Sequence, residues 1–354
     1  MKTSNANIND LVKQVYFPPM SSTGNWSFSR FIGHEYIRYY SYARHALFDA
    51  LKLCDLKQGD IVLIPGYICR EVLSSINVFG AVPVYYDVTP ELQIKSLKSL
   101  PAAKVIIVVN YFGFPFELDS INEYCSINDT VVIEDNSHGF LSKDANNKPL
   151  GTRTQIGIFS LRKTMPVING AALVVNDPVL QSRLDEQLDY VSDATGFKYE
   201  YFKKMIKTIV PDNGYRLIIK LVKIKQRIRH LLKGAPVTIS SSESEFNLPH
   251  KPNPHNDLKK YIKTILADEE IERRRALYAY LVEYLGSDVD VISRELDSNV
   301  APYVFPFHCD EIDKVKIKLK KINLSCYLWP ELPEKIQPIC PDYYKNVWMV
   351  PFLW

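Results

Sequence analysis

Short apolar runs alternate with helix-like stretches along the first half of the chain. The runs are bounded by glycine or polar residues, as buried strands of a parallel sheet are, and they lie at 59–65, 81–88, 104–110 and 131–134. This strand–helix–strand order predicts an α/β fold, in which right-handed crossovers place a mainly parallel sheet between helices.

Three further stretches complete this half of the chain. A helix is expected within 35–53, where small and aliphatic residues recur at helical spacing. The run 171–176 is expected to close the sheet, because the Asn-Asp-Pro sequence at its end is a turn signal. Residues 1–33 show no clear period, so we expect an arm laid over the body or over a partner subunit.

The last third of the chain predicts a smaller unit. A linker rich in Ser and Pro at 239–254 is followed by a charged helix at 257–285. A Lys-rich helix at 312–321 then lies between two short strands, at 304–308 and 324–329. Strands interleaved with helices make a small α/β domain. The expected organisation is an arm at 1–33, a large domain at 34–238 and a small C-terminal domain at 239–354.

A basic segment interrupts the large domain. Ten of the 31 residues in 203–233 are Lys or Arg and only Asp212 is acidic, while apolar residues recur at helical spacing. A basic amphipathic helix can lie on an anionic membrane surface. More often such a helix packs its apolar stripe on its own protein and leaves its charges in water, and this is the reading we prefer.

Composition narrows the class of protein. The net charge of +3 does not require a nucleic-acid partner. The six cysteines form no CxxC pair or ligand cluster, so no metal site is predicted, and without a signal peptide they indicate reduced thiols in a cytoplasm. No apolar run approaches the roughly 20 residues that a membrane-spanning helix needs.

The stretch 131–163 carries the candidate chemistry. A buried strand ends at Asp135, and the next apolar run delivers Ser160 and then Lys163. Ligands bind at the carboxyl ends of strands in open α/β sheets. An acid and a lysine there suit pyridoxal phosphate (PLP), whose aldehyde bonds to a lysine and whose ring nitrogen stays protonated beside a carboxylate. Taken singly, such an Asp is usually a turn residue and such a Lys a solvated charge.

The sequence IEDNSHG, followed by GIFSLRKT, resembles the DegT/DnrJ/EryC1/StrS family of sugar aminotransferases, which are fold-type I PLP enzymes. The resemblance runs from about Arg44 to Asp177. It implies an aspartate-aminotransferase-like large domain and a small C-terminal domain. It also implies site roles: Asp135 for the pyridine nitrogen, His138 for the ring hydroxyl, Ser160 for the phosphate and Lys163 for the aldehyde.

Two positions depart from the family pattern. The family binds the phosphate through a Gly-Thr or Gly-Ser pair at a helix start, where this chain has Ala43-Arg44. Arg44 is either a guanidinium donor to the phosphate or a solvated helix-face arginine. The aromatic residue that stacks on the ring is matched by Cys69, and Tyr67 is either the replacement or plain core. The segment 329–333 is expected to line the mouth of the site.

The resemblance implies transfer of an amino group from glutamate to a keto-sugar, nucleotide-linked, for cell-surface polysaccharide synthesis. Dehydratase relatives carry histidine in place of the lysine, and Lys163 argues against that reaction. Two alternatives stay open: a PLP-fold enzyme that acts on a different small keto acceptor, and a non-catalytic PLP-fold regulator.

A homodimer is also implied, because the resembling enzymes build their cleft at a two-fold interface. The segment 213–216 weakly matches one that reaches the partner subunit's phosphate. Aromatic residues of the arm fit the same expectation, since aromatic side chains are enriched at interfaces; they are Tyr16, Phe17, Trp26 and Phe28.

Overall fold

The computed structural model describes residues 8–21, 24–192 and 241–353, together with single positions between 205 and 224. Its larger half is built on a seven-stranded sheet with the order β1-β7-β6-β5-β4-β2-β3. The strands are β1 (Ile37–Tyr40), β2 (Ile61–Pro65), β3 (Val82–Tyr86), β4 (Val105–Val109), β5 (Val131–Asp135), β6 (Ile156–Phe159) and β7 (Ala171–Val175).

The sheet is mainly parallel, and the predicted α/β class of fold is confirmed. The pairs β2/β3, β2/β4, β4/β5 and β5/β6 are parallel, whereas β7 pairs antiparallel with both β6 and β1. The expectation that β7 closes the sheet was wrong, because β1 lies outside it. The strand signal of β1 was hidden by Arg38, which is buried against Asp49 at 2.8 Å instead of lying in water.

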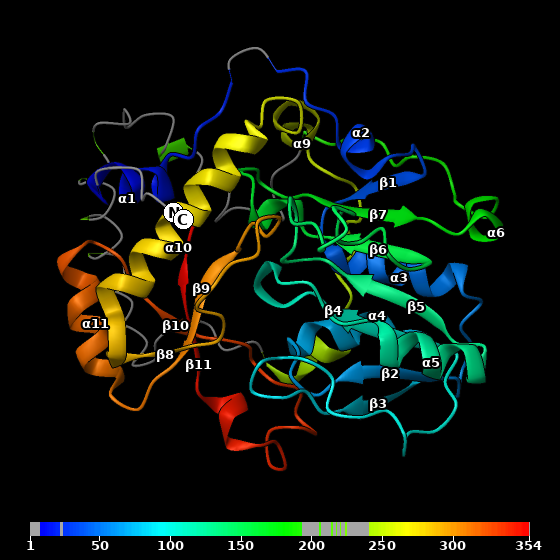
Figure 1. Ribbon diagram of the computed structural model, residues 1–354. Helices are drawn as coiled ribbons and strands as arrows, with labels where there is room; N and C mark the ends of the chain where they lie inside the picture. The colour runs from blue at the N-terminus through cyan, green and yellow to red at the C-terminus, as the bar shows by residue number, and fades with distance from the viewer. Residues whose placement is uncertain are drawn as a thin grey trace.

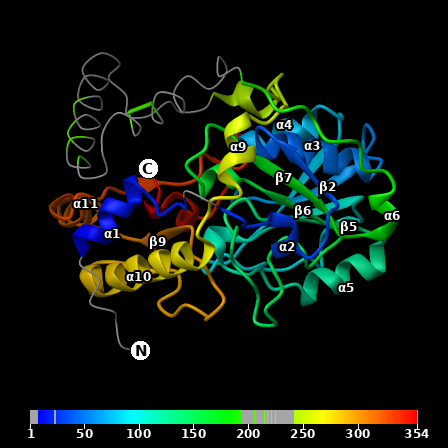
Figure 2. The same cartoon turned by 90° about the horizontal axis from the view of Figure 1, so that it is seen from above.

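Helices cover both faces of this sheet. Figure 2 shows α3 (Ala43–Leu53) and α4 (Leu73–Asn77) on one face and α5 (Asp119–Asn128) on the other. The buried side of α3 consists of small and aliphatic residues, among them Ala46, Leu47 and Ala50, and it packs on β6 and β7. The start of α3 lies at the carboxyl ends of the strands, where Ala43 and Arg44 line the same cavity as Asp135 and Ser160.

The second half is built on a four-stranded antiparallel sheet with the order β10-β11-β9-β8. It lies at the left of Figure 1 beside three helices. The elements are β8 (Asp290–Val291), β9 (Val304–His308), β10 (Tyr327–Leu328), β11 (Val347–Pro351), α1 (Ile8–Tyr16), α10 (Ala267–Leu285) and α11 (Ile312–Lys321). The helices α1 and α10 pack together, and Leu11, Val12 and Val15 share a core with Leu277 and Leu281.

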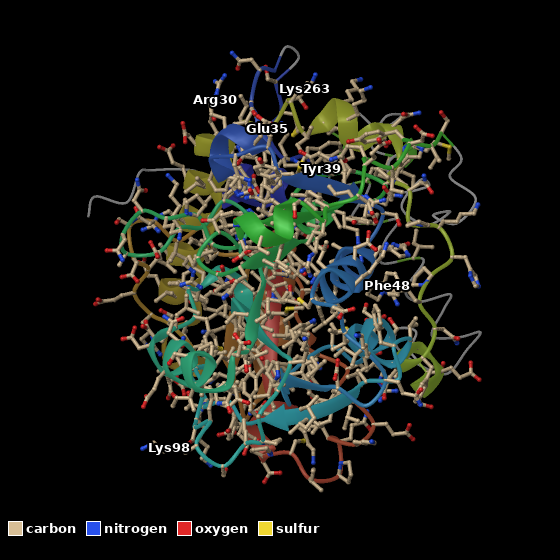
Figure 3. The ribbon with its side chains drawn as sticks, turned by 90° about the vertical axis from the view of Figure 1, so that its right-hand side faces the viewer. Arg30, Glu35, Tyr39, Phe48, Lys98 and Lys263 are labelled. Carbon is tan, nitrogen blue, oxygen red and sulfur yellow. The ribbon has the colours of Figure 1, made fainter. Side chains whose placement is uncertain are left out.

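The N-terminal segment therefore has a period that the sequence reading missed. Its apolar residues at 8, 11, 12 and 15 follow helical spacing within a nine-residue helix. Between this helix and α2 (Phe28–Ile32), the backbone of Ser21 and Trp26 donates to the carbonyls of Thr264 and Lys263, at 2.8 and 3.3 Å. Figure 3 shows Arg30 and Lys263 at one edge of the molecule, where these segments meet.

The same contacts correct the charged helix predicted at 257–285. It is two helices, α9 (Asn256–Tyr261) and α10, because the residues between them turn their backbone groups toward the N-terminal segment. Gly24 is required at this contact: a Cβ there would lie 1.7 Å from the carbonyl oxygen of Lys263.

The arm's aromatic residues were predicted to be interface material, and for Phe28 this was wrong. Phe28 is buried in the protein's own core, with its ring 5.2 Å from Phe159 and 5.8 Å from Phe140. Trp26 packs edge-on against Phe140 at 5.8 Å. These rings cover one end of the large sheet, so their burial is explained within one chain.

Two predictions fall almost entirely outside the described residues: the basic helix at 203–233 and the segment 213–216. Among the residues that are described, no helix is both long and apolar enough to cross a membrane.

Candidate active site

A cavity of about 260 Å³ lies at the carboxyl ends of the parallel strands. Asp135 is the last residue of β5, Ser160 follows β6, and the first turn of α3 closes one side. The structure brings all the site residues expected from the sequence to this one cavity: Ala43, Arg44, Cys69, Asp135, His138, Ser160 and Lys163. It also brings in residues that the sequence reading did not single out: Tyr42, Glu71, Val109 and Arg162.

Lys163 is held in a one-turn 3-10 helix, η3 (Leu161–Lys163), where its N–H donates to the carbonyl of Ser160 at 3.1 Å. Burial lowers the pKa of the Lys163 amine, and the nearby Asp135 carboxylate opposes that shift. The amine lies 5.8 Å from the ring centroid of Tyr303. A lysine with a lowered pKa exists more often as the neutral amine, which is the form that attacks a carbonyl or accepts a proton.

Asp135 and its neighbour Glu134 have separate tasks, because successive strand residues point to opposite faces of the sheet. Glu134 is fully buried beneath the sheet and binds Arg153 at 2.7 Å and Asn110 at 2.8 Å. Asp135 faces the cavity, where burial raises the pKa of its carboxyl. Its Oδ1 accepts the N–H of Ser137 at 2.9 Å, and within the described residues Oδ2 makes no hydrogen bond.

His138 is fixed by aromatic rings. It stacks on Phe112, with ring centroids 5.6 Å apart, and on Tyr303, with centroids 4.7 Å apart; the edge of Trp329 is 4.9 Å away. Burial lowers the pKa of His138 well below its usual value, so the ring is neutral. The backbone N–H of Phe112 donates to Nδ1 at 3.4 Å, which leaves the proton on Nε2 and makes Nε2 a donor.

Phe112 has a left-handed backbone, with φ of 56°. Besides its bond to His138, its carbonyl accepts the N–H of Tyr303 at 2.7 Å. Strained residues of this kind persist where the surroundings fix them, often at functional sites. In the sequence, the turn YFGFP was the available signal for Phe112. No sequence signal pointed to Tyr303, which lies in the segment entering β9.

The two candidates for the ring-stacking position are now separated. Tyr67 is fully buried behind Trp329: its hydroxyl donates to the Trp329 carbonyl at 2.5 Å, and it does not line the cavity. Cys69 does line it, and its Sγ donates to Glu71 at 2.6 Å. Burial raises the pKa of the Cys69 thiol to about 12, so it is not a reactive thiolate. Of the segment 329–333, Trp329 lines the cavity.

The start of α3 offers unused donors. Tyr42 precedes the helix and provides no side-chain cap, and within the described residues the N–H groups of Ala43 and Arg44 donate to nothing. The hydroxyl of Ser160, on a residue that is 3% exposed, is also without a partner there. Free amides at a helix N-terminus bind anions, phosphate above all.

Comparisons with known proteins agree with this architecture. The DegT/DnrJ/EryC1/StrS aminotransferase family model matches residues 25–217. Protein MosB of Rhizobium meliloti is 31% identical over 162 residues, which are 43% of this chain and 31% of MosB. GDP-perosamine synthase of Escherichia coli O157:H7 is 28% identical over 169 residues, 44% of this chain and 46% of the synthase. The chain therefore spans less than half the length of these curated relatives.

Solved structures share the whole fold. A DegT DnrJ EryC1 StrS aminotransferase from Brucella abortus is 16% identical, with 97% of this chain and 89% of that chain covered at a TM-score of 0.60. The sugar aminotransferase CalS13 from Micromonospora echinospora is 15% identical, with 98% and 92% covered at a TM-score of 0.62. These structures show the fold. The family model matches more than half of the chain, and on that ground the chain belongs to the DegT/DnrJ/EryC1/StrS aminotransferase family.

Proposed function

We propose that the protein is a PLP-dependent aminotransferase that moves an amino group from a small amino donor to a keto-sugar. The observation that carries the proposal is the pairing of Lys163 with Asp135 in one cavity, where burial lowers the pKa of the lysine. A neutral amine beside a buried carboxylate is what this chemistry needs. The scaffold or regulator alternative gives no reason to bury these two groups together.

The residues around the cavity fit PLP. Lys163 would hold the aldehyde carbon, and the free oxygen of Asp135 would hold the ring nitrogen. The donor Nε2–H of His138 suits the ring hydroxyl, and the unpaired hydroxyl of Ser160 and the first amides of α3 suit the phosphate. When bound, PLP supplies an electron-accepting ring that stabilises a carbanion at the substrate carbon.

The chain's own residues then have distinct tasks. The lowered pKa of Lys163 favours the neutral amine, which would take a proton from the substrate carbon and return it to the carbon that replaces it as the protonated centre. Asp135 keeps a proton on the ring nitrogen through charge pairing, which the buried setting strengthens. Trp329, Val109 and Ile158 give the cavity part of its apolar lining.

Family membership and the names of relatives support the proposed substrate class. One relative is named GDP-perosamine synthase and another L-glutamine:2-deoxy-scyllo-inosose aminotransferase. A nucleotide-linked keto-sugar is therefore the proposed acceptor, in cytoplasmic synthesis of a cell-surface polysaccharide. We propose glutamate as the donor; the second name makes glutamine the alternative to be tested beside it.

The test is a half-reaction screen on PLP-loaded protein. Adding L-glutamate or L-glutamine alone should remove the cofactor's visible absorbance, and a nucleotide-linked keto-sugar should then restore it. Lys163→Ala is the matched negative control. Restoration by a small keto acid other than the donor's own keto product, but by no sugar, would favour the other keto acceptor. A spectrum that no donor changes would favour the non-catalytic alternative.

A further inference from the structure

Two arginines without carboxylate partners lie beside the start of α3. The guanidinium carbons of Arg44 and Arg162 are 5.5 and 5.3 Å from the ring centroid of Tyr42, and both side chains line the cavity. Neither makes an ion pair within the described part of the chain, and Nε of Arg162 is buried without an acceptor. A buried donor without an acceptor is costly, so an anion at this place would remove a penalty.

Neutral donors converge on the same place. α3 has eleven residues and no acid in its first turn, so nothing in the helix cancels the partial positive charge at its N-terminus. The amides of Ala43 and Arg44 are unpaired among the described residues, as is the hydroxyl of Ser160, which lines the cavity. Ser160 is an independent sign of a ligand, because a residue that is otherwise buried turns an unpaired hydroxyl toward the cavity, where a ligand can reach it.

We infer that Arg44 and Arg162, with Ser160 and the first amides of α3, hold one phosphomonoester dianion, the phosphate of the proposed cofactor. This inference rests on the proposed function and deepens it. In the resembling family a Gly-Thr or Gly-Ser hydroxyl binds the phosphate; here the charged side chains of Arg44 and Arg162 would bind it instead. Arg44 is then a ligand and not a solvated helix-face residue.

The charges match a single phosphate. Two guanidiniums and a helix N-terminus supply about +2.5, against about −1.5 to −2 on a phosphate monoester at pH 7. Too little positive charge is left for a nucleotide diphosphate at the same place. The nucleotide of a linked sugar must therefore bind elsewhere around the cavity.

Inorganic phosphate is the direct probe, because it requires neither PLP nor turnover. The apoprotein is titrated by calorimetry as wild type, Arg44→Gln, Arg162→Gln and Arg162→Lys. Arg30→Gln serves as the matched control, since Arg30 is exposed at the edge of the molecule (Figure 3). Each cavity glutamine variant should weaken phosphate binding about tenfold, and Arg30→Gln should not change it. Arg162→Lys should fall between, because it keeps the charge and loses the planar fork.

A second readout follows the bound cofactor by phosphorus NMR. Free phosphate monoesters gain a proton near pH 6. With two guanidiniums beside it, the PLP phosphate in the wild type should stay dianionic well below that pH. In the Arg44→Gln/Arg162→Gln double variant its titration should move back toward pH 6.

Unchanged phosphate affinity and unchanged phosphorus titration in the variants would overturn the inference. If the glutamine variants do not fold, the wild type still decides, because its phosphate affinity must fall as salt rises; a salt-independent affinity would contradict a charged cradle. Phosphate binding as expected without reaction of PLP at Lys163 would leave the cradle standing and reject the proposed function. Equal PLP affinity and equal labelling of Lys163 in all variants would reject the arginine phosphate site and leave the proposed function standing.

Discussion

The imidazole of His138 lies nearly parallel to the phenol ring of Tyr303, at an interplanar angle of 10° and a centroid distance of 4.7 Å. His138 belongs to the turn after β5 and Tyr303 to the residues entering β9, so this stack joins the two sheets beside the cavity. The N–H of Tyr303 also donates to Phe112, which in turn donates to His138. The stack and these bonds fix both the position and the tautomer of the histidine.

Removing the Tyr303 ring should loosen this arrangement. Tyr303→Ala lets water reach His138, so the lowered pKa of His138 should rise toward its ordinary value of about 6.5. Tyr303→Phe keeps the stacked ring and should leave the pKa low. Proton NMR of the histidine ring against pH gives the values. A His138 that titrates alike in the alanine and phenylalanine variants would show that the ring does not control it.

The buried amine of Lys163 should cost stability in the apoprotein. Its pKa is lowered on folding, so between the folded value and the ordinary value of about 10.4 the unfolded chain binds more protons. Stability is therefore lost as pH falls through this window, by up to about 1.4 kcal/mol per pH unit. Lys163→Met removes the effect and should gain stability over wild type as pH falls from 11 to 8.

Urea unfolding of the apoprotein at several pH values measures this gain. Lys98→Met is the matched control, since Lys98 is exposed at the opposite edge of the molecule from Arg30 (Figure 3). A difference between Lys163→Met and wild type that stays constant from pH 8 to 11 would contradict a shifted amine.

Asp135→Asn should reduce transamination far more than PLP binding. The carboxylate stabilises the protonated ring, whereas the phosphate contacts supply most of the anchoring. PLP affinity from absorbance titration and single-turnover rates with the amino donor separate the two effects. Near-normal turnover in the asparagine variant would remove Asp135 from its role at the ring nitrogen.

We expect a dimer whose sites are shared between subunits, as the resemblance implies. Mixing Lys163→Ala with a variant altered at Arg216 should restore activity as mixed dimers form. Recovery should approach roughly a quarter of wild type, because random pairing makes half the dimers mixed and one site in two intact.

Light scattering tests the predicted dimer independently, by measuring the molar mass of the active protein in solution. A fully active, monodisperse monomer would end the shared-site idea. Equal recovery with a second mutation outside 213–216 would keep the dimer and remove that segment from the site.

The central residues of the site could be predicted from the sequence, because each lies at or just after the end of a predicted strand. Asp135 and Ser160 stand at strand ends, and Lys163 comes one short turn later, so the order of elements alone predicts that they meet. Tyr303 and Arg162 escaped this reasoning for a physical reason: their roles depend on which rings and charges the packing places beside them. Cys69 was matched through the family resemblance, but its bond to Glu71 is seen only in the fold.

The elements of the fold likewise divide into those that local sequence predicts and those that depend on tertiary packing. The runs at 104–110 and 131–134 became β4 and β5 with little change, because strands buried on both faces are almost purely apolar. The strand β1 was missed because its buried Arg38 pairs with an acid from α3. The helix α1 was missed because nine residues give a weak periodic signal until α10 supplies the surface that it covers.

The most direct test of the central claim asks which lysine PLP bonds. PLP-loaded protein is reduced with borohydride, digested and mapped by mass spectrometry, with Lys163→Arg treated in parallel. The account predicts one labelled peptide that contains Ser160 to Lys163, and no label at that position in the variant. A label on another lysine, or equal labelling of the variant, would contradict the assignment of Lys163 and with it the proposed site.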